Sequence, residues 1–305
     1  MRRLFPVALA LALAACGGHP PSPAAPPAPE AAPVTADKDL ELAGGANALW
    51  WDAASSTLFL TDNNADALLA YTDTGGLAPV VTLPASEHGI SLGGIVRHPD
   101  GTILVASFGF GKAGTVFRVG ADRIASALTG LDPVRRRVGL AQDATGALYT
   151  GYFVGGKGET IGGVAKLDVQ GASASEIEIA GASTKAGLQK VVGLVATPDA
   201  IYVADQGQHT IFKLGVPGFQ LAPLATVAKV DLLIQLPGGD LLTGGGSEIA
   251  RITPAGAVTP VALPNTHFDQ VRGLAFDPAG KRLFIIDHST TPGRPDRLHV
   301  RSFPG

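Results

Sequence analysis

The sequence contains a single cysteine, Cys16, among 305 residues. No intrachain disulfide can therefore form, and no cysteine or histidine cluster has the spacing of a zinc site. Charged residues are also scarce, at 16% of the chain, and the net charge is −3. A protein that tracks nucleic-acid phosphates carries a basic face. The composition thus excludes nucleic acid as the expected partner, and leaves packing alone to stabilise the fold.

The sequence also lacks any sustained apolar pattern at helical spacing after its first residues. Instead, 40 glycines and 23 prolines interrupt the chain every few residues, while 46% of all residues are hydrophobic. Frequent turn residues between short apolar runs are typical of strands and hairpins. These features indicate an all-β body that is apolar enough to bury a large core.

The N-terminus has a different composition. Arg2 and Arg3 precede an apolar run at residues 4–13, which is followed by Leu-Ala-Ala-Cys at residues 13–16. This segment resembles a bacterial lipoprotein signal peptide with its lipobox. The resemblance implies cleavage before Cys16 and lipidation of that cysteine. The alternative is an ordinary secretory signal with a chance cysteine, and the run is too short for a transmembrane helix.

Residues 19–36 (HPPSPAAPPAPEAAPVTA) form a Pro/Ala tract that cannot bury a core and favours an extended tether. We therefore divide the chain into a signal peptide (1–15), a lipidated cysteine with its tether (16–38) and a single domain (39–305). The expected location is the bacterial cell envelope, with the membrane bound through Cys16. By analogy with lipoproteins, Gly17 after the cysteine favours the outer membrane, facing the periplasm or the surface.

One β-hairpin pattern recurs six times in the domain. Each copy has an apolar run, a turn and a second apolar run, as in VRGLAFDPAGKRLFIID at residues 271–287. The other copies lie at residues 47–62, 93–107, 138–151, 192–205 and 231–244. Their first turn residues are spaced by 46, 45, 54, 39 and 41 positions, a mean of 45. This period is that of a four-stranded propeller blade.

A third strand pattern follows every hairpin, and a fourth follows the first five copies. The sixth copy ends at Gly305 without a fourth strand, whereas residues 39–43 (DLELA) precede the first copy. We therefore predict a six-bladed β-propeller of four-stranded antiparallel blades. Its ring is closed by the N-terminal strand at residues 39–43, which joins the last blade and leaves no open edge.

The second position of each inner strand supports this arrangement. Inner strands converge near the axis, where small residues allow the backbones to approach. Five of the six positions hold Gly or Ala, and Leu232 is the exception, which predicts an irregular fifth blade. These positions are Ala48, Gly94, Gly139, Gly193, Leu232 and Gly273.

Two family resemblances follow from these residues. IYVADQGQHTIFKL at residues 201–214 looks like an NHL-type propeller repeat, and the hairpin pattern resembles the gluconolactonase and senescence-marker-protein superfamily. The lactonases of that superfamily bind a divalent cation through Glu, Asn and Asp at the channel mouth. Here Asn47 stands at the Glu position, Val192 at one candidate for the Asn position and Asp231 at the Asp position. The resemblance thus implies a Ca²⁺-type cation held by Asp231 and Asn47, although only Asp231 matches in residue type.

The residues that open the inner strands are expected to face the channel mouth, and the preceding loops add a mildly basic rim for a small anion. The ligand-binding candidates are Asn47, His88, Arg137, Asp231, His267 and Arg272. His267 near Asp269 is also a candidate general base with an orienting carboxylate. Two structural alternatives stay open. Asp231 can pair with Arg272 or Lys229, and the arginines at 135–137 can form a solvated loop paired with nearby acids.

Two functions are compatible with this sequence. The first is binding of a small ligand or a protein partner at the channel-mouth face of a lipid-anchored propeller. The alternative is a metal-dependent lactonase or hydrolase of the gluconolactonase type, which requires several oxygen ligands around Asp231. A third hypothesis is that the propeller serves only as a scaffold for protein assembly, and it predicts an exposed apolar patch.

Overall fold

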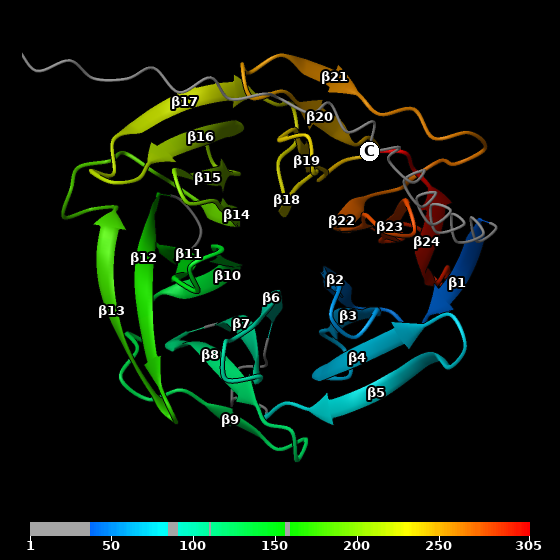
Figure 1. The fold of residues 1–305 in the computed structure, drawn as a ribbon, viewed down its shortest axis with the longest axis horizontal. Coiled ribbons are helices and arrows are strands. Elements are labelled where there is room, and N and C mark those ends of the chain that lie inside the picture. The colour runs from blue at the N-terminus through cyan, green and yellow to red at the C-terminus, as the bar shows by residue number, and fades with distance from the viewer. Residues whose placement is uncertain (1–36, 85–90, 110, 156–158) are drawn as a thin grey trace, which may run out of the picture. The chain divides into compact units, whose positions relative to one another are not determined.

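The computed structural model describes residues 37–84, 91–109, 111–155 and 159–305. All of them belong to the second of the two units into which the chain divides, Met1–Pro33 and Val34–Gly305. The described residues form 24 strands in six four-stranded sheets, with no α-helix among them (Figure 1). Accordingly, no helix within this described part is long and apolar enough to cross a membrane.

In the first five sheets, four consecutive strands pair in chain order, beginning with the innermost strand. The first two blades are β2 (Ala46–Asp52), β3 (Thr57–Asp62), β4 (Ala67–Thr72), β5 (Gly76–Thr82) and β6 (Leu92–Arg97), β7 (Ile103–Gly109), β8 (Ala113–Val119), β9 (Ala125–Ala127). The third and fourth are β10 (Arg136–Gln142), β11 (Leu148–Gly155), β12 (Thr160–Gln170), β13 (Ser173–Ala180) and β14 (Val191–Ala196), β15 (Ala200–Asp205), β16 (Thr210–Gly215), β17 (Leu221–Thr226). The fifth is β18 (Leu233–Gln235), β19 (Leu241–Thr243), β20 (Ala250–Ile252), β21 (Val258–Pro260).

The sixth blade contains both ends of the domain. It consists of β22 (Val271–Asp277), β23 (Arg282–Asp287), β24 (Asp296–Ser302) and β1 (Lys38–Leu42). β1 pairs antiparallel with β24, with Lys38 opposite Val300 and Leu42 opposite Asp296. The predicted six-bladed propeller and its closure by the N-terminal strand are confirmed. The strand begins and ends one residue earlier than the sequence pattern indicated.

Small residues do bring the inner strands together. A Cβ added to Gly193 would lie 2.8 Å from the carbonyl oxygen of Asp231, and one added to Gly273 would lie 2.9 Å from that of Asn47. Real Cβ atoms are not found this close to backbone, so these glycines are required by the approach of neighbouring blades. The fifth blade, where Leu232 replaces the small residue, is built from strands of three residues each. The predicted irregularity is confirmed.

The hydrophobic core is divided among the interfaces between neighbouring blades. Six apolar clusters occur among the described residues. Five combine side chains of two adjacent sheets, and one extends from the third blade through the fourth to the fifth. In the cluster between the last and first blades, for example, Leu58 and Leu60 pack with Phe284, and all three side chains are fully buried. Each sheet therefore depends on both neighbours for the burial of its faces, and closing the ring completes the interface between the last blade and the first.

Aspartates that end the second strand of three blades fix the turns around the channel mouth. The carboxylate of Asp62 accepts the backbone N–H groups of Asn64 and Ala65 at 2.9 and 3.1 Å. Asp205 accepts those of Gly207 and Gln208 in the same way, and it also accepts the N–H groups of residues 189 and 190. Asp287 accepts the amides that precede its blade, at residues 269 and 270, and its Oδ2 lies 3.7 Å from Nε2 of His299. These acids therefore have a structural role, because each one binds backbone amides of the loops beside its strand.

Candidate functional site

The starts of the inner strands gather around the axis of the ring (Figure 1). Among them Asp231 lies two residues before Leu233, the first residue of β18, and is half-buried. Its Oδ1 accepts the N–H of Leu232 at 3.0 Å. None of the ion pairs between described residues involves this carboxylate, so neither Arg272 nor Lys229 forms the direct pair considered from the sequence. Asp231 therefore keeps acceptor capacity that the surrounding protein does not use.

The environment of Asp231 favours its neutral form. Burial raises the pKa of Asp231 to about 6, while the charge of Arg272, the N–H of Leu232 and the charge of Lys190 act in the opposite direction. The two cations are therefore near enough to act on the carboxylate without touching it. As a result, this group changes its charge close to neutral pH, which is unusual for an aspartate.

Arg272 lies on β22 beside this carboxylate and is also half-buried. Its Nη2 donates to Oε1 of Gln270 at 3.2 Å, whereas its Nε is buried and has no partner among the described residues. Lys190 approaches from the fourth blade, with its Nζ 5.5 Å from the centre of the Phe153 ring. The mouth thus combines one acid, Asp231, with two cations, and one of these cations, Arg272, has an unsatisfied buried donor.

Asn47 is buried at the start of the first inner strand. Its Nδ2 donates to the carbonyl oxygen of Leu92 at 2.6 Å, which joins the first blade to the second. One N–H of the amide is therefore used for the fold. The second N–H and Oδ1 remain for a ligand.

The histidine candidates do not form a catalytic pair. His88 lies outside the described residues. His267 is exposed, and no hydrogen bond joins it to Asp269 among the described side chains. The carboxylate of Asp269 instead accepts from Arg294 Nη1 at 3.2 Å and from Ser289 Oγ at 3.4 Å. The structure therefore does not place His267 as a general base oriented by the carboxylate of Asp269.

The structure places Arg137 in the protein interior rather than on a rim. The side chain is fully buried, and its Nη1 donates to the carbonyl oxygens of Asp132, Arg135 and Gly114. Its Nη2 pairs with Glu176 at 2.8 Å. Burial lowers the pKa of Arg137, while Glu176 opposes this shift. Arg137 therefore connects the second and third blades. The burial of this pair could not be predicted from the sequence, because its partner lies 39 residues away.

The described residues at the mouth do not fit a calcium site. Ca²⁺ takes six or more oxygen ligands, several of them usually carboxylates. Asp231 offers one carboxylate and Asn47 one amide oxygen, and the charge of Arg272 opposes a cation. Within the described part of the chain, no three His, Cys, Asp or Glu side chains are grouped so that they could share a metal ion.

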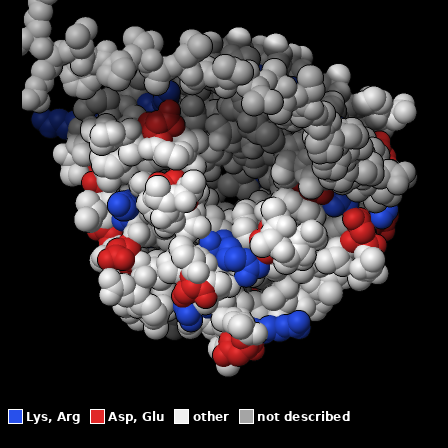
Figure 2. Space-filling view, in the orientation of Figure 1, with Lys and Arg blue, Asp and Glu red and all other residues white. Residues whose placement is uncertain are grey.

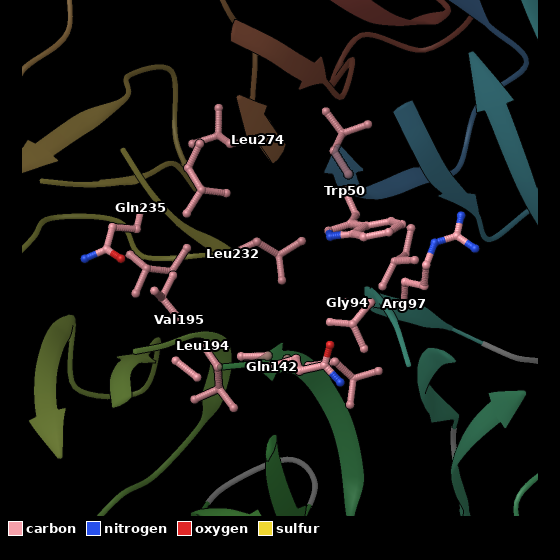
Figure 3. Close-up of a pocket in the computed structure, with 18 residues that line it drawn as sticks. Trp50, Gly94, Arg97, Gln142, Leu194, Val195, Leu232, Gln235 and Leu274 are labelled. Carbon is pink, nitrogen blue, oxygen red and sulfur yellow. The ribbon is translucent and has the colours of Figure 1, made fainter. Parts of the chain in front are cut away.

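A second feature of the channel was missed at the level of sequence. A cavity of about 410 Å³ lies along the axis and is lined by residues of all six inner strands (Figure 3). Apolar side chains form part of its walls, with Leu140, Leu194 and Leu274 among them, and polar groups form a nearly equal part. In the sequence, alternating apolar residues in an inner strand predict only that their side chains are buried in the core. Only the curvature of the ring shows that one set faces an open space.

The outer surface carries charges of both signs. Figure 2 shows lysines and arginines interspersed with aspartates and glutamates over the face in view, without a field of one sign. This agrees with the net charge of −3. The positive character of the mouth therefore comes from a few side chains there, which include Arg272, Lys190 and Arg136.

No family model and no curated protein matches the sequence, whereas many solved structures share its fold. A gluconolactonase from Xanthomonas campestris is 18% identical with a TM-score of 0.67, over 88% of this chain and 90% of that one. Regucalcin from Agrobacterium tumefaciens, a calcium-binding protein, is 13% identical with a TM-score of 0.61, over 85% and 91%. An auxiliary nutrient binding protein from Bacteroides ovatus is 14% identical with a TM-score of 0.60, over 85% and 69%. At these identities, the similarity shows the fold alone.

Proposed function

We propose that this protein binds a small carboxylate-containing molecule at the channel mouth, as a lipid-anchored component of the bacterial cell envelope. The observation that carries the proposal is the buried, unpartnered Nε of Arg272 beside a carboxylate that has no ion pair. A buried donor without a partner costs free energy, and a ligand carboxylate would satisfy it.

The chemical groups at the mouth further restrict the class of ligand that we expect to bind. Arg272 and Lys190 supply the charge that holds a carboxylate. Asp231 uses Oδ1 for a backbone N–H and leaves Oδ2 to accept from a hydroxyl or an ammonium group. Hydroxy acids and amino acids carry both groups on adjacent carbons. They are therefore the ligand classes that this arrangement favours over a simple anion.

A hydrolase of the gluconolactonase type is the second candidate. It is supported by the similarity of fold to a gluconolactonase and by a carboxyl with a pKa of about 6 at the start of the fifth inner strand, as a general base requires. The metal-dependent form of this hydrolase is disfavoured, because Asp231 and Asn47 offer too few oxygen ligands for a metal ion. A protein partner at the same face is the other form of the binding proposal, and a lack of small-molecule binding would favour it.

Calorimetric titration with a panel of hydroxy acids and amino acids tests the binding proposal. Arg272→Gln is expected to weaken binding by at least about tenfold, since it removes a charge-assisted contact worth about 1.4 kcal/mol or more. Arg118→Gln is the matched control, because Arg118 pairs with Asp100 on an outer turn. Equal binding by wild type and Arg272→Gln would reject the site.

The same preparation separates the two candidates. Lactone hydrolysis is measured with calcium and after chelation, in the wild type and in Asp231→Ala. Turnover that requires calcium and disappears in the variant would replace the binding proposal with the hydrolase. Hydrolysis equal to that in buffer alone would leave binding as the function.

The anchor rests on the sequence pattern around Cys16, which lies outside the described residues. Cys16→Ala is expected to abolish labelling by a radioactive fatty acid and to move the protein from the membrane fraction to the soluble fraction. Persistence in the membrane fraction without label would contradict a lipid anchor.

A further inference from the structure

The cavity in the channel is distinct from the mouth site in position and in chemistry. It involves the later residues of the inner strands, from Gly94 to Arg97 on β6 and from Gly139 to Gln142 on β10. Neither Asp231 nor Arg272 lines it. A volume of about 410 Å³ is within the range of small-molecule pockets.

Leu232 lines this cavity at the same inner-strand position as Gly94 and Gly139. It follows Asp231 directly and occupies the second inner-strand position, where the other five blades have Gly or Ala. Its side chain extends towards the middle of the cavity (Figure 3). The fifth blade therefore contributes a polar group to the mouth and, one residue later, an apolar group to the cavity.

The other end of the cavity is polar but carries no net charge. Arg97, Gln142 and Gln235 occupy the last inner-strand positions of three blades. Each donates to a glycine carbonyl four residues later, at 2.9, 3.4 and 3.3 Å respectively. The guanidinium of Arg97 is also neutralised by Asp52, at 2.6 Å.

These hydrogen bonds decide what the polar end offers to a ligand. Because the Nε2 groups of Gln142 and Gln235 are held by the turns, their amide oxygens are left as acceptors. In Figure 3 both oxygens lie on the cavity side of their amides. The polar end thus offers two amide oxygens as acceptors and the buried Nε of Arg97, which has no partner among the described residues, as a donor. Its one charge is paired with Asp52.

One wall of the cavity is aromatic. Trp50 is half-buried and extends into the cavity from β2 (Figure 3). Its ring stacks on Phe59 with centroids 5.7 Å apart, and the Arg97 guanidinium lies 5.9 Å from it. These contacts fix the indole as a rigid planar surface, which suits a flat apolar ligand.

We propose that this cavity is a second binding site, which takes an uncharged and largely apolar small molecule with a hydroxyl or N–H donor at one end. The apolar part lies against Trp50, Leu140 and Leu194. The donor end reaches the amide oxygens of Gln142 and Gln235. Asp231, Arg272 and Lys190 do not line the cavity. A ligand can therefore bind in the cavity without a ligand at the mouth.

Titration with N-phenylnaphthylamine tests the proposal. This dye is flat, uncharged and apolar, has one N–H donor, and fluoresces strongly in apolar surroundings. We expect saturable binding to the full-length protein. Val195→Trp fills the cavity and should weaken binding by at least about tenfold, and Val258→Trp adds the same ring on an exposed outer strand and should not.

Further variants keep the test decisive. If Val195→Trp fails to fold, Ala196→Phe narrows the cavity from a partly exposed position and should also weaken binding. Gln142→Leu with Gln235→Leu should weaken the dye but not a naphthalene that lacks the N–H. Dye binding that survives both filling variants, or that is lost in Arg272→Gln, would overturn the proposal.

Discussion

Asp39 and Arg301 form an ion pair across the seam of the ring, with Oδ1 and Nη2 2.6 Å apart. The same oxygen lies 2.7 Å from Nδ1 of His299. Asp39 belongs to β1 and both partners to β24, so the contact joins the first strand of the domain to the last. This cluster reinforces the backbone pairing that closes the propeller.

Asp39→Asn is expected to lower the free energy of unfolding by about 1 kcal/mol, a modest loss because the aspartate side chain is 47% exposed. Burial raises the pKa of Asp39, but hydrogen bonds from His299 and Arg301 outweigh it and leave the pKa below its usual value. The stabilisation is therefore present above the unfolded-state pKa and is lost as the pH falls through the folded-state value. Urea denaturation at several pH values measures this. Glu41→Gln on the same strand should show neither effect.

Asp231→Asn is expected to stabilise the protein at pH 8 and to have no effect near pH 4. The pKa of Asp231 is raised to about 6, so ionisation between the unfolded and folded values destabilises the native state as the pH rises. The gain above pH 6 is on the order of 2 kcal/mol. Melting temperatures from pH 4 to pH 8 test it, and a gain independent of pH would contradict the assignment.

Arg137→Met is expected to destabilise the protein by about 3–5 kcal/mol, because it leaves the buried carboxylate of Glu176 without its partner. Arg135 keeps one contact with Glu176, at 3.2 Å, and this reduces the loss. Combining Arg137→Met with Glu176→Leu should restore part of the stability in a double-mutant cycle. An additive double variant would show that the pair is not coupled.

Gly193→Ala is expected to cost about 1–3 kcal/mol, because the added methyl group would collide with the backbone of residues 231 and 233 in the next blade. Gly238→Ala is the matched control. Nothing lies within 4 Å of its added Cβ, and its φ is not in the left-handed region. Thermal unfolding of both variants compares them, and equal melting temperatures would refute the close approach of the inner strands.

The fold was predictable because it repeats. Six copies of one hairpin at a mean period of 45 residues determine the blade, and the small residues at positions such as Gly193 and Gly273 determine how closely the blades approach. The missing fourth strand of the last copy pointed to closure by the first strand, and β1 pairs with β24 as that requires. Each of these signals is local or periodic, so it can be read along the chain.

The site was predictable only in part. The opening positions of the inner strands led to Asp231 and Arg272, whose environment supports a mouth site. The same reasoning assigned Arg137 to the rim, whereas it is buried and paired with Glu176. His267 and Asp269, two residues apart, form no hydrogen bond. Proximity in sequence did not produce contact, because loop conformation sets where short polar side chains point.

The sequence by itself determined the blade count, the strand order and the end at which the ring closes, since these depend on periodicity and on the steric size of single residues. Only the tertiary structure decided which charges are satisfied and where space remains. An ion pair such as Arg137–Glu176 and a cavity bounded by six strands exist only when distant segments meet. The free energy of a buried charge or an open apolar wall depends on all of those neighbours at once.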